Sequence, residues 1–342
     1  MFTNGSNNTL PAETTSSPED KSSRGWFALF LTLVALFGHT LVFLAFYRER
    51  KLRTLQNIVI INLSVADFLF SAIVPSTHVV RLLRREETLS ETPCYVTGVA
   101  SMLLCLASIN TLTFISIERF MATNYPIKHR RYFDLKLVKV ALAIIWCWSA
   151  ILSAFPFLTT KYVFLKRFFH CSPDWAKNLA TTLTLVILGI GIPLVILIYC
   201  NFHIVYALRQ SRQIHTNNTN RDISNARYKR ERQMSVLTFA VVVTFAICWA
   251  PYSAAMLCLA RGNCGFSEDF MFLALILSIL NSSCNPLIYG LLNRNFRNGF
   301  KNIITCRRAE TSPANMLTMA ATQNCFTDFK MTKRRTIYND NI

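Results

Sequence analysis

Long apolar runs separated by short polar segments form the dominant pattern along this chain. Seven such runs cover residues 26–47, 57–80, 94–123, 137–158, 179–208, 235–259 and 270–292. Each has the length of about 20 residues or more that a helix needs to cross a bilayer. Because backbone polar groups in lipid must be satisfied within the segment, we expect helices, whereas a transmembrane β-barrel would show short alternating segments. The pattern predicts an all-α membrane protein, a seven-transmembrane helix bundle over residues 26–292.

The two ends of the chain are polar. Residues 1–25 show no cleavable signal peptide and carry N-glycosylation sequons at Asn4 and Asn7, which predicts an extracellular, glycosylated arm. Residues 293–306 alternate apolar and basic positions at helical spacing, which predicts a short amphipathic eighth helix on the membrane surface.

The last part of the chain carries one candidate modification site. Cys306 lies beside two arginines and is a candidate for palmitoylation. Residues 307–342 are expected to be a disordered cytoplasmic tail with Ser and Thr sites for phosphorylation.

The basic charge of the chain follows the predicted helix ends. The chain has 36 Lys and Arg residues against 18 Asp and Glu, a formal net charge of +18. Such an excess can indicate nucleic-acid binding. Most of the basic residues, however, flank the same ends of the apolar runs, as the positive-inside rule requires of cytoplasmic segments. We therefore predict a multi-pass protein of the plasma membrane with its amino terminus outside, surrounded by membrane lipids and without a nucleic-acid partner.

A carboxylate stands in the middle of the second run. Charged residues inside a bilayer are costly and usually functional, so Asp67 needs partners from other helices or an ion. Ser108 in the third run and Asn281 and Asn285 in the seventh are suited to face it. One carboxylate with hydroxyl and amide oxygens suits a small hard cation, so Na⁺ is a candidate ligand; a polar network without an ion is the alternative.

A second charged group lies at the predicted cytoplasmic edge. Glu118 and Arg119 end the third run, and Glu231 precedes the sixth, so a cation and anions on two neighbouring helices can hold the inner face closed. Prolines inside the fifth, sixth and seventh runs would kink these helices or act as hinges, and they are Pro193, Pro251 and Pro286. Together these features predict a two-state switch in which the sixth helix moves outward.

These residues occur in a familiar set of motifs. The chain contains Asn62-Leu-Ser-Val-Ala-Asp67, Glu118-Arg119-Phe120, Phe245-Ala-Ile-Cys-Trp249-Ala-Pro251 and Asn285-Pro-Leu-Ile-Tyr289 followed by Phe296. In order, spacing and placement on the spans, this set resembles the rhodopsin-like (class A) G-protein-coupled receptors over residues 26–306.

The resemblance implies roles for individual residues. It assigns Asp67, Ser108, Asn281 and Asn285 to a sodium site, and Arg119 with Tyr289 to a G-protein switch that Glu118 and Glu231 restrain. It implies a disulfide between Cys94 and Cys171. It also implies a relay between the ligand pocket and the switch, formed by Ile109, Pro193, Phe245, Trp249, Pro251, Asn285 and Pro286.

The chain departs from the family pattern at two positions. His39 stands where the family has asparagine in the first span, and it brings a group that can titrate near neutral pH. Asn201 replaces the tyrosine that usually follows the proline of the fifth span, with Tyr199 displaced. The second change weakens the expected support of Arg119 in the active state.

The ligand class is less defined than the switch. Ser101 replaces the aspartate that pairs with amine ligands, and Ile279 replaces the lysine that binds retinal. By family position, the pocket is expected to be lined by Ser101, Met102, Cys105, Leu185, Gly189, Tyr252, Ser253, Met256 and Leu275. This mostly apolar set fits a neutral or lipophilic small molecule. A peptide ligand at the outer loops, where Arg81, Arg84 and Arg85 lie, is the alternative within the class.

Two other classes are disfavoured. A transporter would show inverted repeats or broken helices with charge pairs at the midplane, and an enzyme would need a convergent set of catalytic groups in the spans. We expect neither. The expected partners are a heterotrimeric G protein, arrestin, a receptor kinase and an extracellular ligand, with no cofactor other than a possible allosteric Na⁺.

Overall fold

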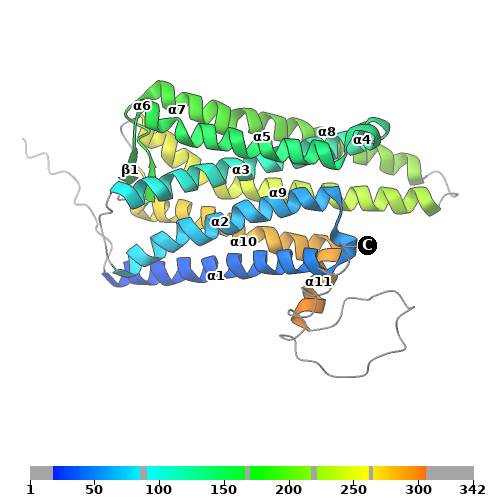
Figure 1. Cartoon of the computed structure of the whole chain (residues 1–342), viewed down its shortest axis with the longest axis horizontal. Helices are drawn as coiled ribbons and strands as arrows, with labels where there is room; N and C mark the ends of the chain where they lie inside the picture. Colours follow the sequence, from blue (N-terminus) through cyan, green and yellow to red (C-terminus); the bar gives the residue numbers. More distant parts are fainter. Residues whose placement is uncertain (1–17, 85–90, 166–169, 217–221, 262–264, 306–342) are drawn as a thin grey trace, which may run out of the picture.

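Seven long helices make up the chain in a computed structural model that describes residues 18–84, 91–165, 170–216, 222–261 and 265–305. Each contains a segment long and apolar enough to cross a membrane, and they lie side by side in one bundle (Figure 1). They are α1 (Pro18–Arg48), α2 (Leu55–Arg84), α3 (Glu91–Asn124), α5 (Leu135–Ala154), α7 with η3 and α8 (Leu179–Val186, Ile187–Gly191, Ile192–Thr216), α9 (Asp222–Ala260) and α10 (Glu268–Leu292). The predicted seven-helix fold is confirmed.

Several helix ends differ from the apolar runs. α1 begins at Pro18, inside the polar arm, and α9 begins at Asp222, well before its apolar run starts at residue 235. The polar first turns of these helices need no lipid, so the apolar pattern cannot mark them. The fourth run is interrupted after Ala154, because Pro156 starts the separate short helix α6 (Pro156–Thr159).

Short elements connect the helices. η1 (Arg50–Leu52) and α4 (Pro126–Tyr132) join consecutive helices at one end of the bundle, where α11 (Arg294–Ile304) also lies. At the opposite end, β1 (Tyr162–Leu165) pairs antiparallel with β2 (His170–Pro173), with Leu165 opposite His170. We call these two ends of the bundle the α11 end and the hairpin end (Figure 1).

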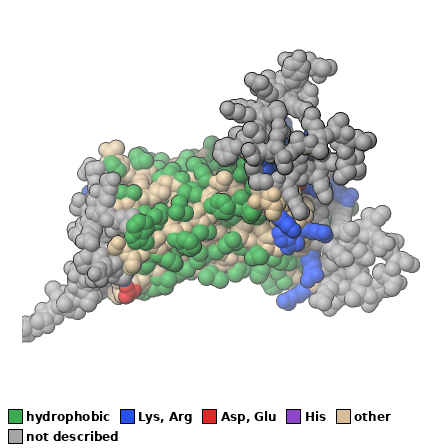
Figure 2. Space-filling model, turned by 90° about the horizontal axis from the view of Figure 1, so that it is seen from below, with side chains coloured by type: hydrophobic (Ala, Val, Ile, Leu, Met, Phe, Trp, Pro, Cys, Tyr) green, Lys and Arg blue, Asp and Glu red, His purple; other side chains and the backbone are tan. Residues whose placement is uncertain are grey.

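The outer surface of the bundle is apolar. Large side chains such as Trp26, Phe30 and Phe37 are 60%, 61% and 62% exposed. Figure 2 shows hydrophobic side chains over the middle of the molecule and Lys and Arg side chains gathered at the α11 end. An apolar band of this kind is stable in lipid and would aggregate in water.

The eighth helix is anchored by its first turn. The Asn293 side chain caps α11 by accepting hydrogen bonds from the backbone N–H groups of Asn295 (3.0 Å) and Phe296 (3.4 Å). Phe296 is fully buried, with its ring 5.6 Å from that of Tyr289 in α10. Gly299 lies so close to α1 that an added Cβ would be 3.0 Å from Ala45 Cβ. The predicted amphipathic helix is therefore also packed against α1 and α10.

Candidate functional site

A cavity of about 200 Å³ lies between the helices toward the hairpin end. Its lining includes eight of the residues expected by family position: Ser101, Met102, Cys105, Leu185, Tyr252, Ser253, Met256 and Leu275. Gly189 is not among the lining residues. Gly189 sits in the π-helical η3 and faces the packed core, where an added Cβ would be 2.8 Å from a Leu106 methyl carbon. Its neighbours Val186 and Ile190 line the cavity instead.

The hairpin end contributes lining residues that the sequence did not indicate. His170 of β2 reaches the cavity, and its Nε2 lies 3.3 Å from Ser101 Oγ. The His170 ring also lies edge-on to Tyr252, with centroids 6.5 Å apart. Trp175 adds an aromatic wall and donates a hydrogen bond to Ser172 Oγ at 2.9 Å. His170 and Ser172 lie in β2 and Trp175 follows it, where no helical periodicity marks an inward-facing position. Their proximity to Cys171 is the one available signal.

The hairpin is fixed to α3 and α5 by covalent and polar contacts. The expected disulfide between Cys94 and Cys171 is present, with a Cα–Cα distance of 5.3 Å. Tyr162 is buried and donates a hydrogen bond from its hydroxyl to the Ser153 carbonyl oxygen at 2.8 Å. Burial raises the pKa of this phenol above its ordinary value of 10.0. Gly98 permits the approach, because an added Cβ would be 2.5 Å from Tyr162 Cδ1.

The floor of the cavity is an aromatic cluster around Trp249 of α9. Its ring contacts Phe70 (6.1 Å between centroids), Tyr252 (5.6 Å) and Phe245 (5.9 Å). Phe245 belongs to a buried apolar cluster that also contains Ile109 and Tyr289. One continuous packed core therefore joins the cavity floor to the α11 end.

The predicted prolines lie inside the long helices. Pro193 and Pro286 are buried, Pro251 is partly buried, and α2 holds a further proline at Pro75. α1 packs directly on Pro286, because an added Cβ on Gly38 would be 2.9 Å from its Cβ and Cγ atoms. The prolines thus occupy packed interhelical contacts, where a change in kink would move neighbouring side chains.

Asp67 lies in a buried polar group in the middle of the bundle. Ser108 Oγ donates to Asp67 Oδ1 at 2.9 Å, and Asn285 Nδ2 donates to Oδ2 at 2.6 Å. The Oδ1 atoms of Asn281 and Asn285 are buried without a hydrogen-bond partner among the described residues. The structure therefore brings Asp67, Ser108 and Asn285 together as the sequence predicted, and leaves buried amide oxygens on the same face of α10.

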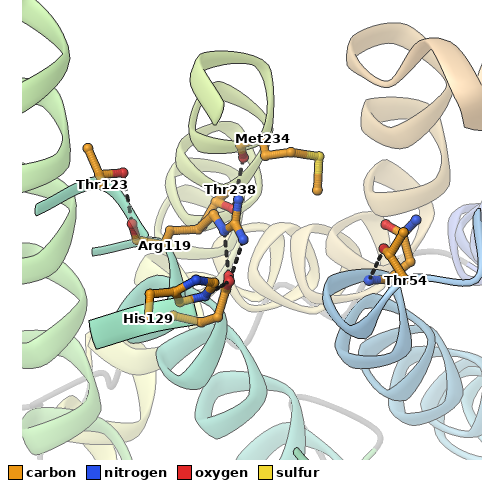
Figure 3. Close-up of polar contacts among 8 residues, drawn as sticks. Thr54, Arg119, Thr123, His129, Met234 and Thr238 are labelled. Carbon is orange, nitrogen blue, oxygen red and sulfur yellow. Dashed lines mark hydrogen bonds and ion pairs between the residues drawn. The ribbon is translucent and has the colours of Figure 1, made fainter. Parts of the chain in front are cut away.

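The charged group at the α11 end is held by an unexpected partner. Arg119 is 1% exposed and donates hydrogen bonds from Nε and Nη2 to the Glu118 carboxylate. His129 of α4, which lies beside Arg119 in Figure 3, has its Nε2 2.7 Å from Glu118 Oε1. Its ring stacks on Phe133 with centroids 4.8 Å apart. The Glu231 side chain falls outside the described residues, so its pairing with Arg119 stays a prediction.

α9 is tied to the junction of α10 and α11. Gln233 Nε2 donates to the Leu292 carbonyl oxygen at 2.6 Å, and Asn293 Nδ2 donates to Met234 Sδ at 3.8 Å. The sequence did not indicate this contact, because the partner of Gln233 is a backbone atom. It fastens the end of α9 that the switch hypothesis requires to move.

Comparison with known proteins decides the family. Residues 38–289 match the model of the seven-transmembrane receptor (rhodopsin family). The chain belongs to this family. Its fold also matches the crystal structure of squid rhodopsin with a TM-score of 0.75 at 21% identity, over 94% of this chain and 99% of that one.

The curated relatives of this receptor are different kinds of receptor by name. It is 27% identical to Melanopsin-B of Xenopus laevis over 83% of this chain and 55% of the relative, and 28% identical to the Tachykinin-like peptides receptor 86C of Drosophila melanogaster over 87% and 63%. It therefore spans less than two thirds of the length of either. Melatonin receptor type 1A of Mus musculus is 28% identical over 83% of this chain and 80% of the relative.

The two departures of this receptor from the family pattern have defined surroundings. His39 is buried with its Nε2 3.0 Å from the Ser282 carbonyl oxygen, so Nε2 carries the hydrogen and links α1 to α10. Asn201 Nδ2 donates to Ser116 Oγ (3.2 Å) and to the Leu197 carbonyl oxygen (2.8 Å), which links α8 to α3. Tyr199 is 54% exposed on the outer surface.

Other predicted sites lie partly or wholly outside the described residues. These are the glycosylation sites Asn4 and Asn7, the palmitoylation site Cys306, the loop residue Arg85 and the side chains of Arg81 and Arg84. Cys258, at the end of α9, is disulfide-bonded. Within the described ranges, no cluster of His, Cys, Asp and Glu has the arrangement of a metal site.

Proposed function

We propose that this receptor binds a small neutral or lipophilic molecule in the hairpin-end cavity and activates a heterotrimeric G protein at the α11 end. The observation that carries the proposal is the continuous core between the two ends. Trp249 and Phe245 line the cavity, and Phe245 packs in one cluster with Tyr289, which precedes α11. A ligand that shifts Trp249 therefore displaces packed side chains along α9 and α10, because close-packed interiors transmit strain.

The proposed output is release of the groups that hold α9 and Arg119. In the present arrangement, Glu118 holds the Arg119 guanidinium and Gln233 holds α9 to Leu292. Outward movement of α9 would break the Gln233 contact and open a cleft beside Arg119. Arg119 could then donate its hydrogen bonds to the G protein in place of Glu118. Arrestin and a receptor kinase are further proposed partners at this face.

The proposed topology places the hairpin end outside the plasma membrane. The Lys and Arg side chains at the α11 end support it, since cytoplasmic segments are rich in basic residues (Figure 2). The disulfide at the hairpin end supports it too, because disulfides persist in oxidising compartments.

The ligand class rests on the cavity lining. Among the described residues, no Asp, Glu, Lys or Arg lines the cavity, and the walls are mostly apolar and aromatic. A light-absorbing retinal ligand is disfavoured, since α10 contains no lysine and Ile279 is buried at the matching position. A peptide remains the second candidate, supported by the tachykinin-like peptides receptor among the relatives.

Asp67 is proposed to bind Na⁺ as an allosteric ion. The donor set fits, because a carboxylate lies with a hydroxyl and with buried amide oxygens that have no other partner among the described residues. The ion would neutralise the buried carboxylate.

The experiment is a ligand screen on cells that express the receptor with chimeric G proteins. Matched cells with the Trp249→Ala variant serve as the control. A hit must act through wild type, lose at least tenfold in potency on Trp249→Ala and promote nucleotide exchange on purified G protein. If only peptides produce a response, the peptide-receptor alternative replaces the small-molecule proposal. If no compound and no peptide promotes nucleotide exchange, the receptor function is refuted.

A further inference from the structure

His170 occupies an unusual place for a loop residue. It is 5% exposed, lines the cavity and faces Ser101, the position at which amine receptors of this family carry aspartate. The cavity therefore holds a Ser–imidazole pair at the point where a related receptor would hold a carboxylate.

The position of His170 is fixed from three sides. Cys171 is bonded to α3 through Cys94, and β1 pairs with β2 so that Leu165 lies opposite His170. Gly98 lets the hairpin approach α3 one helical turn before Ser101. The imidazole is thus part of the cavity wall and is held there by the disulfide and the strand pairing.

Most other hydroxyl groups in the lining are already engaged. Ser172 donates to the Pro173 carbonyl oxygen (3.1 Å), Thr182 to that of Trp175 (2.8 Å) and Ser278 to that of Leu275 (2.7 Å). The Ser101 and His170 pair differs, since its two groups bond to each other and each can act as donor or acceptor. A ligand group that inserts here can exchange one side-chain hydrogen bond for another.

We propose that Ser101 and His170 form the polar anchor of the ligand site, and that the site takes a small uncharged aromatic molecule with one hydroxyl group. This inference rests on the proposed function, because it takes the hairpin-end cavity as the ligand site. A volume of about 200 Å³ lies below the ~300–1,000 Å³ of pockets for drug-sized ligands, which limits the size. Aromatic walls at Trp249, Tyr252 and Trp175 favour a flat ring system. A permanent charge would be buried without an opposite charge in the described lining.

The test uses four matched probes that share one ring system: 2-naphthylmethanol, 2-naphthylmethylamine, 2-naphthoate and 2-methylnaphthalene. Their affinities for the full-length receptor in lipid nanodiscs are measured by surface plasmon resonance. We expect 2-naphthylmethanol to bind more tightly than the other three. One hydrogen bond corresponds to about a two- to tenfold change in affinity, so Ser101→Ala and His170→Phe should each weaken the alcohol by about that factor and the double variant by more. Binding of 2-methylnaphthalene should stay within about twofold in both variants, which also shows that the cavity is intact.

Ser278→Ala is the matched control, since it removes a lining hydroxyl that is bound to backbone. Its effect on the alcohol should stay within about twofold. The inference is overturned if the amine or the carboxylate binds more tightly than the alcohol, if the alcohol shows no binding up to roughly 1 mM, or if neither Ser101→Ala nor His170→Phe weakens it.

Nucleotide exchange measured in the same discs separates the two proposals. Alcohol binding in a receptor on which no compound or peptide promotes exchange refutes the proposed function alone, whereas exchange driven by other compounds without alcohol binding refutes the inference alone.

Discussion

His129 Nε2 lies 2.7 Å from Glu118 Oε1, so the carboxylate that holds Arg119 is also held by the short helix α4. α4 begins at Pro126 directly after α3, and the His129 ring is supported by its stack on Phe133. His129 thus positions Glu118 from the loop side. His129 shares Oε1 with Arg119 Nη2, so the carboxylate is held by α4 as well as by the arginine that it restrains.

His129→Phe should therefore raise basal G-protein activation. Phenylalanine keeps the stack on Phe133 but removes the hydrogen bond to Glu118. The loss of one partly buried hydrogen bond, about 0.5–1.5 kcal/mol, corresponds to an increase of about two- to tenfold in the active population. Basal nucleotide exchange in nanodiscs measures it. Lys128→Gln, which changes the neighbouring side chain over Tyr125, is the control, and equal exchange in wild type and His129→Phe would rule out a restraining role for His129.

Asp67→Asn should remove any stabilisation by sodium. An ion that binds the folded receptor raises its melting temperature with concentration. Wild type should melt at a higher temperature in NaCl than in choline chloride at equal ionic strength, and Asp67→Asn should show no difference. A wild-type receptor that melts at the same temperature in both salts would end the proposal of a sodium site.

Gln233→Ala should loosen α9. The variant removes the 2.6 Å hydrogen bond to the Leu292 carbonyl oxygen and leaves the core of α9 unchanged. We expect basal exchange to rise by about two- to tenfold. Arg297→Ala removes another side-chain bond to this junction, from Arg297 Nη1 to Leu291, without touching α9. An equal rise of basal exchange in both variants would contradict this account. It would show that the junction of α10 and α11 affects exchange and that the Gln233 hydrogen bond from α9 does not.

Tyr162→Phe should lower stability and weaken the ligand site without changing the switch. The lost hydrogen bond to Ser153 should cost about 1 kcal/mol, read as a lower melting temperature. Because burial raises the pKa of Tyr162, its contribution is present below the unfolded pKa of 10.0 and is lost as pH rises above that value. The difference between variant and wild type should therefore be constant from pH 6 to 9, and a difference that grows toward acid pH would contradict this account.

The sequence predicted the membrane-facing architecture because lipid imposes one simple pattern. Long apolar runs located every transmembrane helix, and the carboxylate at Asp67 could be paired with Ser108 and Asn285, since each lies on a helix of known order. Helix ends were less accurate, because α1 and α9 extend into polar segments where lipid gives no signal.

The residues that sequence reasoning missed lie on loops or contact backbone. His129 and His170 reach helical partners only through the geometry of α4 and of the hairpin, and Gln233 bonds a carbonyl oxygen. Gly189 is not in the cavity lining, and it lies within the π-helical turn η3, which departs from regular helical spacing. Local periodicity carries no information about any of these contacts.

The central claim is that Arg119, once released from Glu118, activates the G protein. Glu118→Gln removes the charge that holds Arg119, so this variant tests the claim without a known ligand. Nucleotide exchange on purified G protein should rise above wild type in Glu118→Gln and fall to the receptor-free rate in the double variant Glu118→Gln/Arg119→Ala, with both variants at wild-type surface expression. Exchange in the double variant equal to that of Glu118→Gln would contradict the account.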